Sequence, residues 1–206
     1  MSLRRLGCAL LLGAAGAMLG GCATVEPAPS LAGNSEQAQR NWDARRAALE
    51  QVHDFSLQGR LAESGLVSFG GDLSWIQNGS HFQARFYGPL GVGALAIEGE
   101  PGDMEVRAKD GTYRTGVPEV LMQEKFGWSM PVDGLRYWVL GLPAPGAGAA
   151  LQLDDGGHIL SLRQNGWQLD YAEYQNVAGL DLPRKFALSD PQRRFRVFID
   201  TWSDVR

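Results

Sequence analysis

The sequence predicts a β-rich α+β fold: an open, curled antiparallel sheet of about 11 strands (a half-barrel) with short helices over its concave face. Three observations predict it. From Phe55 onward apolar and polar residues alternate, turn residues interrupt the alternation about every ten residues, and 27 of the 206 residues are glycine. Strands at this spacing pair as antiparallel neighbours, because parallel strands need long crossovers. So many strands in one sheet have to curl, which creates a concave face.

The N-terminal residues are predicted to precede the folded part of the chain. Two arginines are followed by a 14-residue apolar run, Leu6 to Leu19, which is too short to span a bilayer and is typical of a signal peptide. We therefore assign residues 1–21 to a signal peptide. Residues 22–34 are rich in Pro and Gly without periodicity and predict a flexible tether. Residues 35–206 are expected to form a single domain.

One helix and six strands are expected in the first half of that domain. Apolar residues spaced by three and four predict a helix from Asn34 or Ser35 to about His53. Gly70–Gly71 suggests a β-bulge, and Asn78–Gly79 is a strong hairpin signal. The strands expected next cover residues 55–61, 67–75, 82–87, 92–98, 104–108 and 113–115.

Two short helices and a second group of strands are expected in the other half. Pro118 and Pro131 are each placed to open a helix, and Gly141 is placed to end the second one. Asp155–Gly156 and Asn165–Gly166 predict hairpins. The strands expected here cover residues 151–153, 159–163, 167–171, 182–188 and 195–199.

Several classes of function lack support in the sequence. The chain carries 19 Lys and Arg against 23 Asp and Glu, so it has no basic footprint for nucleic acid. Cys8 and Cys22 precede the folded region, which leaves no cysteine for a disulfide or metal site. His53, His81 and His158 are expected to be solvated, and no nucleophile or phosphate-binding motif is present. We therefore predict no enzyme, no metal and no cofactor.

Aromatic and aliphatic side chains are expected to gather on the concave face. They either fill a core or leave part of it as an open apolar cavity, and periodicity alone does not distinguish the two. The candidate cavity residues are Trp75, Phe82, Phe86, Leu95, Ile97, Leu121, Trp138, Leu169 and Phe186.

The end of the apolar leader resembles a bacterial lipobox. Leu19-Gly20-Gly21-Cys22 has Leu three residues before Cys and small residues between them. The resemblance implies cleavage before Cys22, a diacylglyceryl group on its sulfur and an acylated amino terminus. The next residue is not Asp, which by resemblance to lipoprotein sorting rules favours the outer membrane. The other interpretation is an ordinary signal peptide with Cys22 as a spare thiol.

The order of the motifs resembles the LolB family of outer-membrane lipoprotein receptors. After the lipobox come Gly59-Arg60, Gly88-Pro89-Leu90-Gly91, Met130-Pro131, the run Leu135-Arg136-Tyr137-Trp138-Val139-Leu140-Gly141-Leu142-Pro143, Asn165-Gly166-Trp167 and Phe195-Arg196-Val197. This resemblance implies an apolar cavity under a helical lid. It also implies a monomer on the periplasmic face of the outer membrane.

The same resemblance implies a function and further site residues. A LolB-like protein accepts acylated lipoproteins from the periplasmic carrier LolA and inserts them into the outer membrane without nucleotide. Gly88, Pro89, Leu90 and Gly91 would form the membrane-facing loop, with Leu90 as its apolar tip. A structural or scaffolding outer-membrane lipoprotein with a filled core remains the alternative. A lipid hydrolase is disfavoured, because no nucleophile–base pair is visible.

Overall fold

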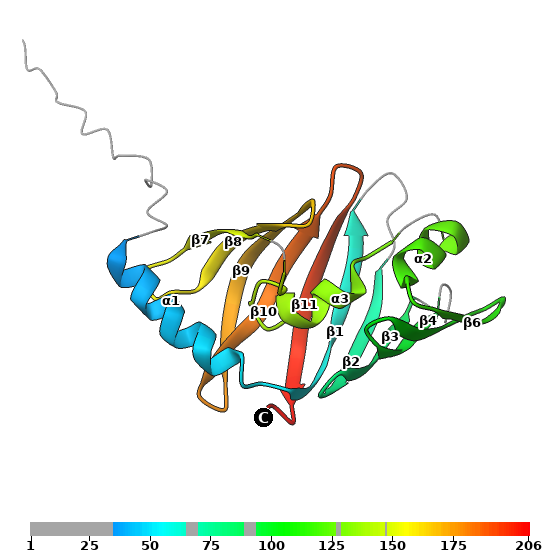
Figure 1. The fold of residues 1–206 in the computed structure, drawn as a ribbon, viewed down its shortest axis with the longest axis horizontal. Coiled ribbons are helices and arrows are strands. Elements are labelled where there is room, and N and C mark those ends of the chain that lie inside the picture. Colours follow the sequence, from blue (N-terminus) through cyan, green and yellow to red (C-terminus); the bar gives the residue numbers. More distant parts are fainter. Residues whose placement is uncertain (1–34, 65–69, 89–93, 127–128, 147) are drawn as a thin grey trace, which may run out of the picture. The chain divides into compact units, whose positions relative to one another are not determined.

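A single antiparallel sheet contains all the strands of the computed structural model, which describes residues 35–64, 70–88, 94–126, 129–146 and 148–206. Figure 1 shows the sheet with the helices on one of its faces. The elements are α1 Glu36–Leu49, β1 Asp54–Ser64, β2 Gly70–Asn78, β3 His81–Tyr87, β4 Leu95–Glu100, β5 Asp103–Ala108, β6 Gly111–Thr115, α2 Pro118–Phe126, α3 Val132–Trp138, β7 Ala150–Leu153, β8 Ile159–Gln164, β9 Trp167–Val177, β10 Leu180–Ser189 and β11 Arg194–Ser203. The predicted fold class, an open antiparallel sheet of 11 strands with short helices, is confirmed.

The strand order explains why helices cover one face. It runs β6-β5-β4-β3-β2-β1-β11-β10-β9-β8-β7, so the first and last strands pair at the centre. β6 and β7 follow each other along the chain but form opposite edges of the sheet. The segment between them, which contains α2 and α3, therefore has to cross from one edge to the other. A single uninterrupted meander would have placed β6 beside β7.

The predicted bulge at Gly70–Gly71 is wrong. β1 and β2 pair without a register shift from Asp54 to Ala62, and the irregularity lies at Gln58/Gly59 in the pairing of β1 with β11. Gly71 instead allows the backbones of β2 and β3 to come close together, because a Cβ at this position would lie 2.1 Å from the Tyr87 carbonyl oxygen. A glycine inside a strand indicates either situation, and the sequence does not separate them.

Helix α1 follows its predicted start but ends earlier than expected. The Ser35 side chain caps it by accepting a hydrogen bond from the Ala38 amide at 3.1 Å. Its buried face consists of Ala38, Trp42 and Leu49, at the spacing expected for an amphipathic helix. The helix ends at Leu49 rather than near His53.

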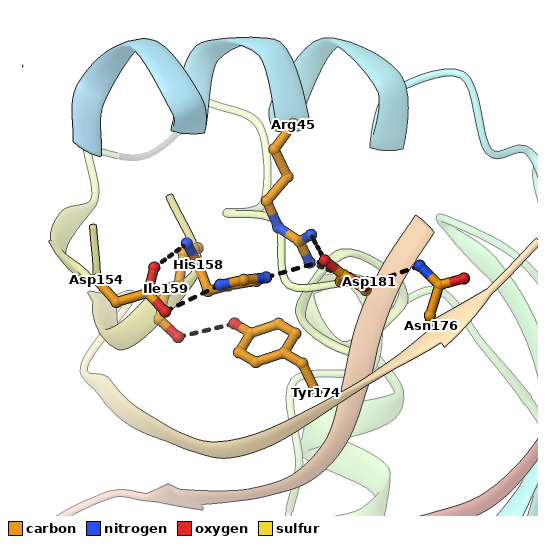
Figure 2. A network of polar contacts seen from close by, with 7 residues as sticks. All are labelled: Arg45, Asp154, His158, Ile159, Tyr174, Asn176 and Asp181. Atoms are coloured by element: carbon orange, nitrogen blue, oxygen red, sulfur yellow. Dashed lines mark hydrogen bonds and ion pairs between the residues drawn. The ribbon is translucent and has the colours of Figure 1, made fainter. Parts of the chain in front are cut away.

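A polar network fixes α1 to the sheet (Figure 2). The Arg45 guanidinium reaches from α1 to the backbone oxygen of Asp181 on β10 and lies 5.1 Å from the centre of the Tyr174 ring. His158 joins two carboxylates: its Nδ1 is 2.9 Å from Asp154 and its Nε2 is 3.2 Å from Asp181. Contacts with residues of β9 and β10 thus hold one helix in place.

The network corrects the expectation that His158 is solvated. Its side chain is 23% exposed and lies 4.7 Å from the Tyr174 ring. Asp154 lies in the predicted turn, but its side chain also accepts the His158 amide at 2.8 Å. Hydrogen bonds from Asn176 and His158 lower the pKa of Asp181, whereas burial raises the pKa of Tyr174.

Candidate functional site

An apolar cavity lies between the sheet and helices α2 and α3. Its volume is about 70 Å³, and its wall exposes no polar surface to the hollow. The lining residues are Leu61, Leu73, Trp75, Ala84, Arg85, Phe86, Leu95, Ile97, Met122, Met130, Val132, Leu135, Val139, Phe186 and Val197.

Strand alternation and register bring the floor of the cavity together. Trp75 on β2 lies opposite Ala84 on β3, and Ala84 lies opposite Ile97 on β4. All three face the same side of the sheet, because directly paired residues of an antiparallel sheet share a face. The small side chain of Ala84 between two large neighbours leaves part of the volume unfilled.

Methionine and β-branched or aliphatic side chains form the roof. α2 contributes Met122 and α3 contributes Leu135, while Met130 lies between these two helices. Methionine fills irregular spaces because its unbranched chain has three rotatable bonds. These roof residues were missed by the sequence analysis. Val132 and Val139 also belong to the roof, and their spacing with Leu135 on one helical face was the signal that could have identified these three.

Five of the nine predicted cavity residues lie in the wall: Trp75, Phe86, Leu95, Ile97 and Phe186. The other four lie elsewhere. Phe82 stacks on Trp75 with ring centres 5.0 Å apart, and Leu169 is fully buried on β9. Trp138, also fully buried, donates its Nε1 hydrogen bond to Gln164 at 3.0 Å. Leu121 is a half-buried residue of α2 that packs against the core.

Two other predicted sites fall mainly outside the described residues. Cys22, with the whole of the leader and tether, is outside them. Of the four predicted loop residues, Gly88 is described and directly follows β3, whereas Pro89, Leu90 and Gly91 are not.

The size of the cavity limits what it accommodates in this conformation. A volume of about 70 Å³ corresponds to on the order of five water-sized groups. A methylene group is of similar size, so only a short piece of hydrocarbon fits without movement of the roof.

Within the described ranges, no three His, Cys, Asp or Glu side chains come together as a metal site would require. Among those residues, no helix is long and apolar enough to cross a membrane.

Comparison with known proteins identifies the family. The family model described as "Outer membrane lipoprotein LolB" matches residues 53–202. The chain belongs to the LolB family. Similar members are the outer-membrane lipoprotein LolB of Nitrosococcus oceani, 38% identical over 90% of this chain and 92% of the relative, and that of Pseudomonas fluorescens, 34% identical over 90% and 91%. LolB membership confirms the predicted family and assigns the chain to the outer-membrane lipoproteins and to lipoprotein localisation.

Solved structures support the fold alone. A LolA superfamily protein from Nitrosomonas europaea superposes with a TM-score of 0.51 at 9% identity, covering 82% of this chain and 93% of the other. A DUF1329 family protein from Desulfovibrio piger gives 0.50 at 11% identity, covering 82% and 92%. The open sheet seen in this LolB family member is thus shared with proteins of very different sequence.

Proposed function

We propose that this chain is the receptor that accepts acylated lipoproteins from the periplasmic carrier LolA and inserts them into the outer membrane without nucleotide. The observation that carries the proposal is the wholly apolar cavity between the sheet and the helical roof. An acyl chain gains about 0.8 kcal/mol for each CH₂ that leaves water, so three chains of roughly sixteen carbons do not escape freely into solution. They pass from donor to acceptor by direct contact, and each acceptor must bind more favourably than its donor.

The described cavity accommodates roughly a third of one such chain, on the estimate of five methylene-sized groups. Acceptance of a complete chain therefore requires the roof to move away from the sheet. The C-terminal end of α3 is firmly tied, since the Trp138 carbonyl accepts the Tyr171 hydroxyl at 2.8 Å and its Nε1 bonds Gln164. We propose that this end stays in place while the α2 side of the roof opens.

Cys22 and the loop around Leu90 complete the proposal. Acylation of Cys22 would hold the receptor at its target membrane, because two or more acyl chains give stable anchoring. Leu90 would insert into that membrane during delivery. Leu90→Glu is expected to keep acceptance of lipoprotein from LolA and to lose delivery to liposomes, measured by flotation. Equal delivery by Leu90→Glu and the parent protein would refute that role.

The small cavity volume favours a second candidate, a scaffolding lipoprotein whose core is essentially filled. Titration with a fluorescent fatty acid separates the two, using the Cys22→Ala chain, which cannot be acylated at that position. The receptor proposal predicts saturable binding with one site. The scaffold candidate predicts a linear, non-saturable signal.

A further inference from the structure

A second hollow lies beside the apolar cavity and has a different chemistry. Its volume is about 190 Å³, and it lies between the end of α1, the start of β1 and the helix α3. Leu49, Phe55 and Leu140 supply apolar wall, whereas His53, Arg136 and Tyr137 supply polar groups. Among the described residues that line the apolar cavity, Arg85 alone has a charged side chain, and it exposes no polar surface to the hollow.

The two hollows adjoin at the sheet, on β2, and at the helix α3. Trp75 lines the apolar cavity and Gln77 lines the second hollow, and the Trp75 Nε1 donates a hydrogen bond to the Gln77 Oε1 at 3.0 Å. Two consecutive residues of α3 also line different hollows: Leu135 lines the apolar cavity and Arg136 lines the second hollow. The two hollows therefore lie next to each other along β2 and α3.

Among the described residues, three hydrogen-bond donors that line the second hollow have no protein acceptor. Gln77 is satisfied, since its Nε2 donates to the backbone oxygens of Gly79 at 2.8 Å and His81 at 3.3 Å. In contrast, across the residues that the structure describes, no side-chain hydrogen bond or ion pair involves Arg136, the Tyr137 hydroxyl or the His53 ring. The Arg136 guanidinium lies over the Tyr137 ring, 4.8 Å from its centre. Arg136 and Tyr137 are half-buried and His53 is exposed, so water can satisfy these donors until a ligand with acceptor atoms replaces it.

The charge of the wall favours a neutral acceptor. Arg136 contributes one positive charge and Glu50 one negative charge, with the Glu50 carboxylate bound to Arg46 at 2.7 Å. Phosphate groups are usually held by clusters of Arg, and this wall offers the single guanidinium of Arg136. Ester and amide carbonyl oxygens accept hydrogen bonds without a charge of their own, and burying them without donors is costly.

We infer that the second hollow binds the ester and amide carbonyl groups at the head of an acylated cysteine while the tails occupy the apolar cavity. The inference rests on the proposed function and adds a polar subsite to it. Arg136 and Tyr137 would fix the depth to which a lipoprotein's acyl head enters. The apolar cavity alone would bind any hydrocarbon of suitable length.

Two probes and matched variants test the inference in the Cys22→Ala chain. The probes are a tripalmitoyl-cysteinyl peptide and diphenylhexatriene, a fluorescent hydrocarbon without hydrogen-bonding atoms, which the peptide displaces. Arg136→Met keeps the length of the side chain and removes its donors. It is expected to weaken peptide binding by about tenfold and to leave diphenylhexatriene binding within about twofold. Arg196→Met, at an exposed position of β11, is the control and should change neither.

Four results would overturn the inference. Unchanged peptide affinity in Arg136→Met refutes the carbonyl site, and parallel loss of both probes shows that Arg136 only supports the fold. If Arg136→Met loses affinity for dioctanoyl phosphatidic acid but not for dioctanoylglycerol, the second hollow is a phosphate site instead. If Arg136→Met does not fold, Tyr137→Phe provides the same test, and its affinity for the peptide should fall by about threefold. Failure of the parent chain to bind either probe overturns the proposed function as well.

Discussion

Filling the apolar cavity from its floor separates a binding site from an incidental packing gap. Ala84 faces the hollow between Trp75 and Ile97, so Ala84→Leu places three additional carbon atoms in a space for about five. At about 0.8 kcal/mol per buried CH₂, the substitution takes up roughly 2.4 kcal/mol of burial that a ligand would otherwise gain. Probe affinity should therefore fall by about 50-fold.

Stability and affinity are expected to change in opposite directions. The free energy of unfolding of Ala84→Leu, measured with urea, should stay constant or increase, because the added carbons occupy empty volume rather than displacing neighbours. Ala96→Leu is the matched control, since Ala96 is next to Ile97 on β4 and its side chain points to the opposite face. A fluorescent fatty acid should bind Ala96→Leu like the parent chain. Retention of parental affinity by a stable Ala84→Leu protein would refute the reasoning.

Two further predictions concern the contacts that hold the helices on the sheet. The pKa of Asp181 is lowered in the folded state. Its contribution to the free energy of unfolding is therefore present above the ordinary pKa of Asp and is lost as pH falls through the lower folded value. Urea unfolding should thus show an advantage of the parent chain over Asp181→Asn at pH 6 that shrinks toward pH 3, and a pH-independent difference would contradict this. Trp138→Phe removes the hydrogen bond to Gln164 and part of a fully buried ring, and should cost about 1–3 kcal/mol of unfolding free energy. A cost below about 0.5 kcal/mol would show that this bond does not secure α3.

Local patterns in the sequence were enough to predict the strands and most turns. The Asn78–Gly79 pair joins β2 to β3 as expected, with Gly79 at φ +58°, and Asn165–Gly166 joins β8 to β9. Both residues of the second pair have positive φ, the conformation these residue types tolerate best. These signals succeed because they depend on neighbours in sequence alone.

The strand order and the cavity roof depended on long-range contacts that periodicity does not encode. Nothing in β1 or β11 indicates that the first and last strands pair, yet this pairing sends the helical segment across the sheet. The wall therefore gained Met122 and Met130, while Trp138 turned away to bond Gln164. His158 was misjudged for the same reason, since its partner Asp181 is 23 residues away.

The central claim is that hydrocarbon tails occupy the space between sheet and roof. Photo-crosslinking of the Cys22→Ala chain with a diazirine-bearing palmitate, mapped by mass spectrometry, tests it most directly. We expect saturable labelling of cavity-wall residues such as Met122, Met130 and Leu135, and loss of this labelling in Ala84→Leu. Labelling that is non-saturable, or that falls only on the opposite face of the sheet, would contradict it.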